Sequence, residues 1–134
     1  MKLTRASSYA LHALEYMAES GQDKPVQSHR IARDRHIPER FLLKVLKPLV
    51  SARVLRSVKG PHGGYRLAKP PSKISMLEVV EAVEGPIRGH APLAQEASQA
   101  GLDARLAAVC DQAAGLLRKH LAKVRLADLL GPGG

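Results

Sequence analysis

Hydrophobic residues recur at helical spacing along most of the chain and predict a mainly helical fold. Thr4 is placed to cap a first helix that runs to about Ser20, with apolar residues in the i, i+3, i+4, i+7 pattern of a one-sided helix. The Gly- and Pro-containing segment 21–25 interrupts this pattern. A short second helix is expected from His29 to about Arg35, with Ser28 near its start.

A third helix is expected from Pro38 to about Ala52. Pro38 suits the first helical position, where its missing N–H is not needed, whereas Pro48 predicts a kinked last turn or an early end. The positions expected to face outward are Glu39, Arg40, Lys44 and Lys47. The expected buried stripe consists of Phe41, Leu42, Val45, Leu46 and Leu49.

The following segment, RSVKGPHGGYRL at 56–67, predicts a β-hairpin. Gly60 and Pro61 cannot continue a helix, and Gly63-Gly64 can take the positive φ of a tight turn. We expect a narrow tip ringed by Arg56, Lys59, His62 and Arg66. Such a tip suits a phosphate backbone or a minor groove. The alternative is an ordinary solvated hairpin with scattered charge.

Two helices joined by a short turn and followed at once by a hairpin are typical of a winged helix-turn-helix. In that fold the second helix of the pair fits the major groove, and the wing reaches the backbone or the flanking minor groove. The predicted fold class is therefore mainly α with a small β-hairpin, and residues 1–84 are expected to form a winged helix-turn-helix DNA-binding domain. The alternative is three packed helices with solvated charge.

The C-terminal part predicts further helices around a loop. Ser75 can cap a helix that runs to Glu84, with Glu78 in the capping-box position and the glutamates at 78, 81 and 84 on a solvated face. Residues 85–101 are Gly-, Pro- and Ala-rich and predict a loop. The last segment, 102–134, predicts a long helix from Leu102 to Lys123 and a short terminal helix over 124–130.

The long helix carries an apolar stripe with alternating steps of four and three residues. We expect this stripe, widened by Cys110, Leu117 and Leu121, to pair with a second copy across a two-fold axis. The alternative is that it packs on its own domain. The candidate dimerisation residues are Leu102, Leu106, Val109, Ala113, Leu116 and His120.

Charge is strongly segregated along the chain. The net charge is +9, and residues 1–69 hold 14 Lys and Arg against 5 Asp and Glu, whereas residues 70–134 hold 7 of each. This asymmetry indicates a polyanionic partner for the N-terminal half, with basicity for solubility as the alternative. A winged-helix module that binds an acidic protein is the rival from another class. No catalytic constellation, membrane span or signal-peptide core is evident, so we expect a cytoplasmic protein that is not an enzyme.

Several motifs together resemble the bacterial Rrf-type transcription regulators. They are MKLT at 1–4 with YAL at 9–11, Ile37 through Leu42, VKGPHGGYRL at 58–67 and LEVVEAVEG at 77–85. The resemblance implies a homodimer of winged-helix subunits, each with a long dimerisation helix, on a pseudo-palindromic site in double-stranded DNA. A regulator is therefore expected, with repression the favoured mode and activation left open.

The resemblance also implies particular DNA contacts. They fall at Pro38, Glu39 and Arg40, with Phe41 and Lys44 nearby, and in the wing from Lys59 through Gly63. Two positions depart from the family pattern: Leu43 stands where Glu is common, and His62 where the wing commonly has Gly. With the positions suggested by charge, the candidate DNA-binding set is Ser28, Pro38, Glu39, Arg40, Phe41, Lys44, Lys47, Arg56, Lys59, Gly60, Pro61, His62, Gly63 and Arg66.

The number of cysteines limits which cofactor the chain could use to sense a signal. Cluster-binding members of the family carry three cysteines in the loop before the dimerisation helix, whereas this chain has only Cys110. We expect no iron–sulfur cluster, no other cofactor and no metal, and the sequence identifies no small-molecule effector. Cys110 is expected to be a small core residue; the alternative is a redox-sensitive thiol that forms a Cys110–Cys110′ disulfide.

Overall fold

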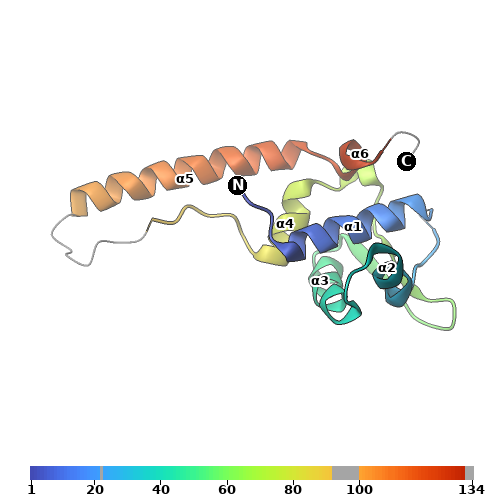
Figure 1. Ribbon diagram of the computed structural model, residues 1–134. Coiled ribbons are helices and arrows are strands. Elements are labelled where there is room, and N and C mark those ends of the chain that lie inside the picture. Colours follow the sequence, from blue (N-terminus) through green and yellow to red (C-terminus); the bar gives the residue numbers. More distant parts are fainter. Residues whose placement is uncertain (22, 92–99, 132–134) are drawn as a thin grey trace.

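The computed structural model describes residues 1–21, 23–91 and 100–131, and its order of elements confirms a mainly helical fold with one small hairpin (Figure 1). A long helix extends from a compact body that contains the other elements. The elements are α1 (Arg5–Glu19), α2 (Ser28–Arg35), α3 (Glu39–Ser51), β1 (Leu55–Val58), β2 (Gly64–Leu67), the 3₁₀ turn η1 (Pro71–Lys73), α4 (Met76–Glu84), α5 (Ala100–Lys123) and α6 (Leu126–Leu129).

The helix starts follow from local capping. The Thr4 side chain accepts a hydrogen bond from the Ser7 N–H at 3.1 Å, as predicted for the start of α1. Pro38 precedes α3 by one residue, and its carbonyl accepts from the N–H groups of Phe41 and Leu42, both at 3.0 Å. Pro48 does not end α3 early, because the helix continues to Ser51.

A complete capping box begins α4. Ser75 Oγ accepts from the Glu78 N–H at 3.1 Å, and a Glu78 carboxylate oxygen accepts from the Ser75 N–H at 2.8 Å. Lys69 Nζ lies 2.7 Å from the same carboxylate. Partial burial acts to raise the pKa of Glu78, but the hydrogen bonds from Lys69 and from the Ser75 backbone outweigh it and hold this pKa below its usual value.

Replacing the cap should destabilise the domain. Ser75→Ala removes the acceptor for the Glu78 N–H, and we expect the free energy of unfolding to fall by about 1 kcal/mol. Denaturant unfolding of the purified variant measures this change. Ser51→Ala, at an exposed serine in the last turn of α3, serves as the control and should stay within about 0.5 kcal/mol of the parent. Equal stability of the two variants would contradict a stabilising role for the cap.

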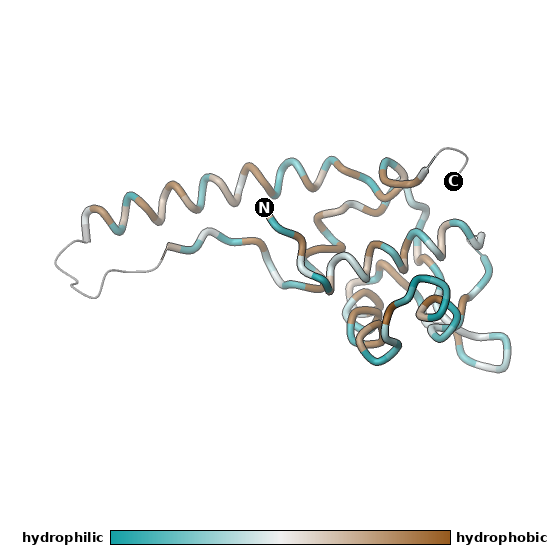
Figure 2. The backbone as a smooth tube through the Cα atoms, viewed as in Figure 1, coloured by the Kyte–Doolittle hydropathy of each residue, from teal (hydrophilic) through white to brown (hydrophobic). Residues whose placement is uncertain are grey.

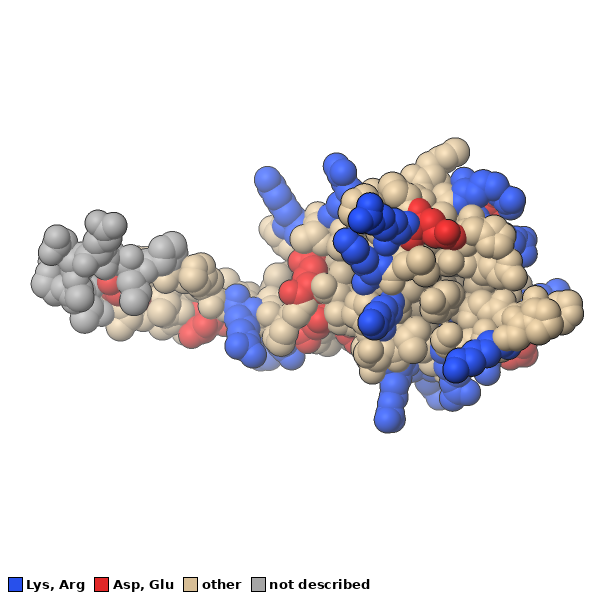
Figure 3. Space-filling model, turned by 90° about the horizontal axis from the view of Figure 1, so that it is seen from below, with Lys and Arg blue, Asp and Glu red and all other residues tan. Residues whose placement is uncertain are grey.

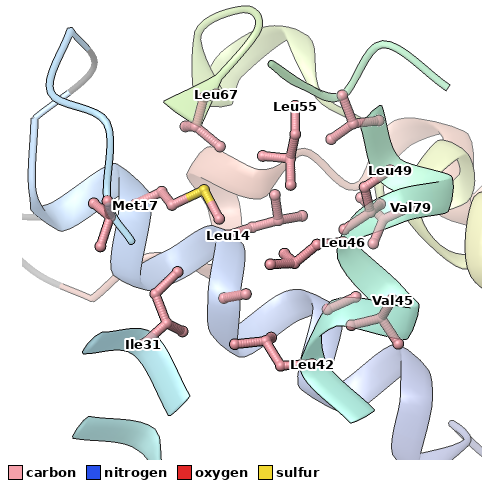
Figure 4. Packing of buried hydrophobic residues seen from close by; sticks show 14 of the residues in the cluster. Leu14, Met17, Ile31, Leu42, Val45, Leu46, Leu49, Leu55, Leu67 and Val79 are labelled. Carbon is pink, nitrogen blue, oxygen red and sulfur yellow. The ribbon is translucent and has the colours of Figure 1, made fainter. Parts of the chain in front are cut away.

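Aliphatic side chains from α1, α3 and the hairpin fill the core (Figure 4). Leu14 and Met17 of α1 lie against Leu46 of α3, and Leu55 and Leu67 of the two strands cover them. The prediction for α3 was wrong at one position, because the Phe41 side chain is 51% exposed. The other predicted stripe residues of α3 are buried, namely Leu42, Val45, Leu46 and Leu49.

The hairpin is antiparallel and is fastened to the segment that precedes α2. Val26 and Tyr65 exchange backbone hydrogen bonds, both at 2.8 Å, so the segment before α2 holds the start of β2 in place. One expectation was wrong, because Arg56 and Arg66 are directly paired across the strands and lie below the tip.

The two central glycines of the hairpin serve different purposes. Gly64 takes φ +146°, as expected, but Gly63 has no positive φ. A Cβ on Gly63 would lie 2.1 Å from the Val58 carbonyl oxygen, so this glycine is required by close backbone approach. A Cβ on Gly64 would likewise lie 2.5 Å from the Val26 carbonyl oxygen.

The glutamates of α4 link elements, so the prediction of a solvated acidic face was wrong. Glu84 accepts hydrogen bonds from Thr4 Oγ1, at 3.0 Å, and from the Ser7 hydroxyl at the start of α1. Glu81 pairs with Arg118 of α5 and also accepts from the Ile87 N–H at 2.8 Å. These contacts fasten both α1 and α5 to α4.

The chain after α5 returns to the compact body. The Met76 N–H donates to the Val124 carbonyl at 2.7 Å, the Leu126 N–H donates to the Ile74 carbonyl at 2.8 Å, and Leu126 is buried. α5 itself begins two residues before the expected Leu102, and the central part of the predicted 85–101 loop, residues 92–99, lies outside the described residues. Among the described residues, no helix is both long and apolar enough to cross a membrane.

Candidate nucleic-acid interface

The turn between α2 and α3 is tight and well anchored. His36 takes the left-handed conformation at φ 55° and ψ 45°, and the Ile37 N–H donates to the Ala32 carbonyl at 2.9 Å. Ser28 Oγ lies 3.4 Å from a Glu39 carboxylate oxygen, so the first residues of α2 and α3 are close in space. The two helix N-termini therefore meet at one place on the surface.

The outward face of α3 is mostly cationic. The side chains of Arg40, Lys44 and Lys47 are exposed, as predicted, at the i, i+4, i+7 spacing of one helix face. Leu43 lies on the same face and is 41% exposed. Lys44 Nζ lies 5.5 Å from the centre of the Phe41 ring, which places a cation beside the exposed aromatic side chain. Pro38 and Glu39 are exposed at the start of this face.

The wing presents a basic, exposed tip. Lys59, Gly60, Pro61 and His62 are exposed, and the turn is closed by a 3.0 Å hydrogen bond from the Gly63 N–H to the Gly60 carbonyl. Gly63, which was also predicted to contact DNA, is buried. Arg56 stands directly opposite Arg66 in the ladder. Like charges in this position destabilise a hairpin, and an anion against that face would relieve the repulsion.

The acidic side chains of this half are mostly engaged away from the interface. Arg35 pairs with Glu15 at 2.5 Å and Glu19 at 3.3 Å, which ties α1 to α2. Asp34 accepts from the Tyr16 hydroxyl and from Arg33, and these two hydrogen bonds lower the pKa of Asp34. These carboxylates therefore neutralise cations that lie outside the α3 face and the wing.

The cations of the interface keep their charge uncompensated. Within the part of the chain that the structure describes, no ion pair involves Arg40, Lys44, Lys47, Arg56, Lys59 or Arg66. Figure 3 views the molecule from the side of α2, α3 and the wing, and shows Lys and Arg side chains projecting all around this face with few acidic side chains among them. This surface is suited to a polyanion.

Sequence reasoning missed two residues of α1 at the edge of this surface. A groove of about 390 Å³ lies between the start of α1 and the start of α3. Arg5 and Tyr9, one helical turn apart on α1, line it together with Phe41 and Lys44. The i, i+4 spacing of an arginine and a tyrosine at the N-terminus of α1 was the available signal, but it does not reveal which helix lies next to it.

The helix α5 has two distinct apolar faces. The predicted dimerisation stripe is exposed: Val109 is 61% and Leu116 69% accessible, and the hydrophobic positions recur along the projecting helix in Figure 2. The prediction that Leu121 widens this stripe was wrong, because it lies about 100° around the helix and is buried against the chain's own body. Cys110 and Leu117 lie about 60–80° from the stripe and are half-buried.

The surroundings of Cys110 do not fit a metal cluster. Cys110 is half-buried in a hollow of about 420 Å³ between α5 and the segment 87–90, with His90 in the same lining. An iron–sulfur cluster needs several thiolate ligands, and the chain supplies one. Over residues 1–21, 23–91 and 100–131, no three His, Cys, Asp or Glu side chains gather as a metal site.

The sequence of this chain is similar to those of known proteins. The family model Rrf2, described as iron-dependent transcriptional regulator, matches residues 3–132. An rrf2-like HTH-type transcriptional regulator of Rhodobacter capsulatus is 36% identical over 125 residues, covering 91% of this chain and 80% of that protein. Protein aau3 of Rhizobium meliloti is 39% identical over 84 residues, which cover 63% of this chain and 54% of that protein. The chain therefore spans about half the length of several of the relatives that it matches.

Solved structures agree with the family match. The structure of CymR, the global cysteine regulator of Bacillus subtilis, aligns with a TM-score of 0.73 and 25% identity over 96% of this chain and 95% of that chain. The T. potens IscR structure shares the fold, with a TM-score of 0.70 and 22% identity over 96% of this chain and 85% of that chain. The winged helix, the wing motif and the family match over residues 3–132 together show that the chain belongs to the Rrf2 family of transcriptional regulators, which are not enzymes.

Proposed function

We propose that the chain binds double-stranded DNA in a sequence-specific manner and regulates transcription as a homodimer. The observation that carries this proposal is the uncompensated positive charge that continues from the outward face of α3 to the wing. A protein partner with an acidic surface is the rival, but an exposed helix beside a basic hairpin matches the width of a major groove and its flanking backbone.

Each element has a role in this complex. The N-terminal half of α3 enters the major groove, where Arg40 and Lys44 reach base edges. The wing tip lies along the backbone or the adjacent minor groove, with Lys59 as its cation. The joined N-termini of α2 and α3 direct backbone N–H groups toward the phosphates between these two contacts.

The exposed stripe of α5 supports a dimer. It extends from Leu102 to His120, about 27 Å along the helix, and a second copy of the same stripe would cover it. A two-fold axis through this contact presents two identical reading faces, which makes the preferred site a pseudo-palindrome. Cys110 lies on the face toward its own chain, so we keep it as a core residue rather than a redox site.

The dimer acts without an iron–sulfur cluster. The family description is iron-dependent, but the donor set around Cys110 does not provide cluster ligands. Repression is the proposed mode, in line with the family resemblance of the wing and α4 motifs. The hollow beside Cys110 is where an effector or a partner could influence α5.

Two substitutions separate backbone contact from base contact. Lys59→Ala should weaken binding about eightfold at 0.1 M salt and lower the slope of log K against log salt by about 1, equally on every duplex. Arg40→Ala should cost about 1–3 kcal/mol on the preferred site and much less on random duplex. Fluorescence anisotropy over a salt series measures both.

The matched control is Lys24→Ala, an exposed lysine outside α3 and the wing, which should leave affinity within twofold, on the order of a surface substitution. Equal losses for Arg40→Ala on preferred and random duplexes would refute base contact by this residue. Binding to an acidic protein, with no binding to duplex, would favour the interaction module.

A further inference from the structure

An exposed apolar side chain borders the cations on the outward face of α3. Leu43 lies one helical turn from both Arg40 and Lys47, at the edge of the face that these two residues form with Lys44, and is 41% exposed. A single exposed leucine is ordinary on most protein surfaces. Here, however, the position lies beside two cations of the surface that meets the bases if the proposed function holds.

Leu43 can offer only one kind of contact to DNA. Its side chain neither donates nor accepts hydrogen bonds, so the donors and acceptors of a G·C edge facing it would be left unpaired. The C5-methyl group of a pyrimidine is the apolar feature of the major groove, and thymine carries it in ordinary DNA. The longer side chains of Arg40 and Lys47, one helical turn before and one after Leu43, extend past it toward polar atoms of the groove.

The backbone around Leu43 is rigid enough to hold it in register. The flanking residues Leu42 and Leu46 of α3 are fully buried in the core, against Leu14 of α1. This packing fixes the rotation of the helix about its axis, and with it the direction in which the Leu43 Cα–Cβ bond points.

We propose that Leu43 is a specificity-determining residue that reads a pyrimidine C5-methyl group in the major groove, normally that of a thymine in each half-site. This inference rests on the proposed function and adds the chemical identity of one base contact. It predicts a thymine at a fixed position on both sides of the two-fold axis of the preferred site.

The test removes one methyl group at a time. Starting from the best duplex in a selection, each thymine is replaced by deoxyuridine, which loses only the C5-methyl. At one position per half-site the parent protein should bind about three- to fourfold more weakly. Leu43→Ala should bind the thymine and uracil duplexes alike. Lys47→Ala, on the same helix face, should bind both more weakly but keep the parent's thymine-to-uracil ratio.

A second arm distinguishes the source of the methyl group. Each cytosine of the duplex is replaced by 5-methylcytosine, and a gain that disappears in Leu43→Ala would assign the contact to methylated cytosine instead. Thermal unfolding controls for folding, since the exposed Leu43 side chain should contribute little to the melting temperature. The proposal would be overturned if neither uracil nor 5-methylcytosine changed the affinity of the parent protein at any position. It would also be overturned if the effect of the methyl group on affinity were unchanged in Leu43→Ala. Failure of the selection itself would instead refute the proposed function.

Discussion

Gly63→Ala should disable the wing while leaving the helical body folded. The added Cβ would lie 2.1 Å from the Val58 carbonyl oxygen and 2.9 Å from the Lys59 carbonyl carbon, both backbone atoms that cannot move alone. The strands must therefore separate or shift, at a cost of about 1–3 kcal/mol in the free energy of unfolding. Because Lys59 and the Arg56–Arg66 pair move with the hairpin, affinity for DNA at 0.1 M salt should fall by about tenfold or more.

Denaturant unfolding and DNA titration of the same preparation measure both effects. The control is Gly115→Ala in the middle of α5, where no atom lies within 4 Å of an added Cβ, and which should stabilise the helix by up to about 1 kcal/mol. Gly64→Ala should behave like Gly63→Ala, because its Cβ would lie 2.5 Å from the Val26 carbonyl oxygen. Parent-like stability and affinity for Gly63→Ala would contradict the close packing of the wing.

Charging the α5 stripe should abolish the dimer and, with it, tight binding. The double variant Leu106→Arg, Leu116→Arg places two cations on the proposed two-fold contact, where both leucines are exposed in the single chain. The monomer should fold normally. Loss of the second half-site should weaken binding to the preferred duplex by about 10²-fold or more.

The control for added charge is the double variant Ala104→Arg, Ala108→Arg. These exposed residues lie on the opposite side of α5 from the stripe, more than about 100° around the helix. This control variant should remain a dimer when measured by sedimentation. It should bind DNA at least as tightly as the parent, since the extra cations attract the phosphate backbone. A dimer that survives Leu106→Arg, Leu116→Arg would rule out this face as the interface.

Local features of the fold could be predicted from the sequence. Thr4 and the Ser75–Glu78 box cap α1 and α4 as expected because a cap depends on residues three positions apart. The stripe of α3 was also predictable, apart from Phe41. That residue lies at the edge of the stripe, and whether a side chain at an edge is buried depends on the neighbouring helix.

Features that depend on distant parts of the chain could not be predicted. Glu84 meets Thr4 and Ser7 from about 80 residues away, and Glu81 meets Arg118 across 37 residues. Periodicity alone gave these glutamates an exposed face. For the same reason, the two apolar faces of α5 were expected to form one stripe. Residue spacing does not show which side of a helix is covered by the rest of its own chain.

Selection of duplexes from a random DNA library with reduced protein tests the central claim most directly. Bound DNA is amplified over several rounds at a salt concentration that suppresses binding through phosphates alone. The account predicts enrichment of one two-fold symmetric site, bound by two copies of the chain. Recovery of duplexes that share no common sequence, bound with an affinity that depends only on the salt concentration, would contradict sequence-specific regulation by this protein.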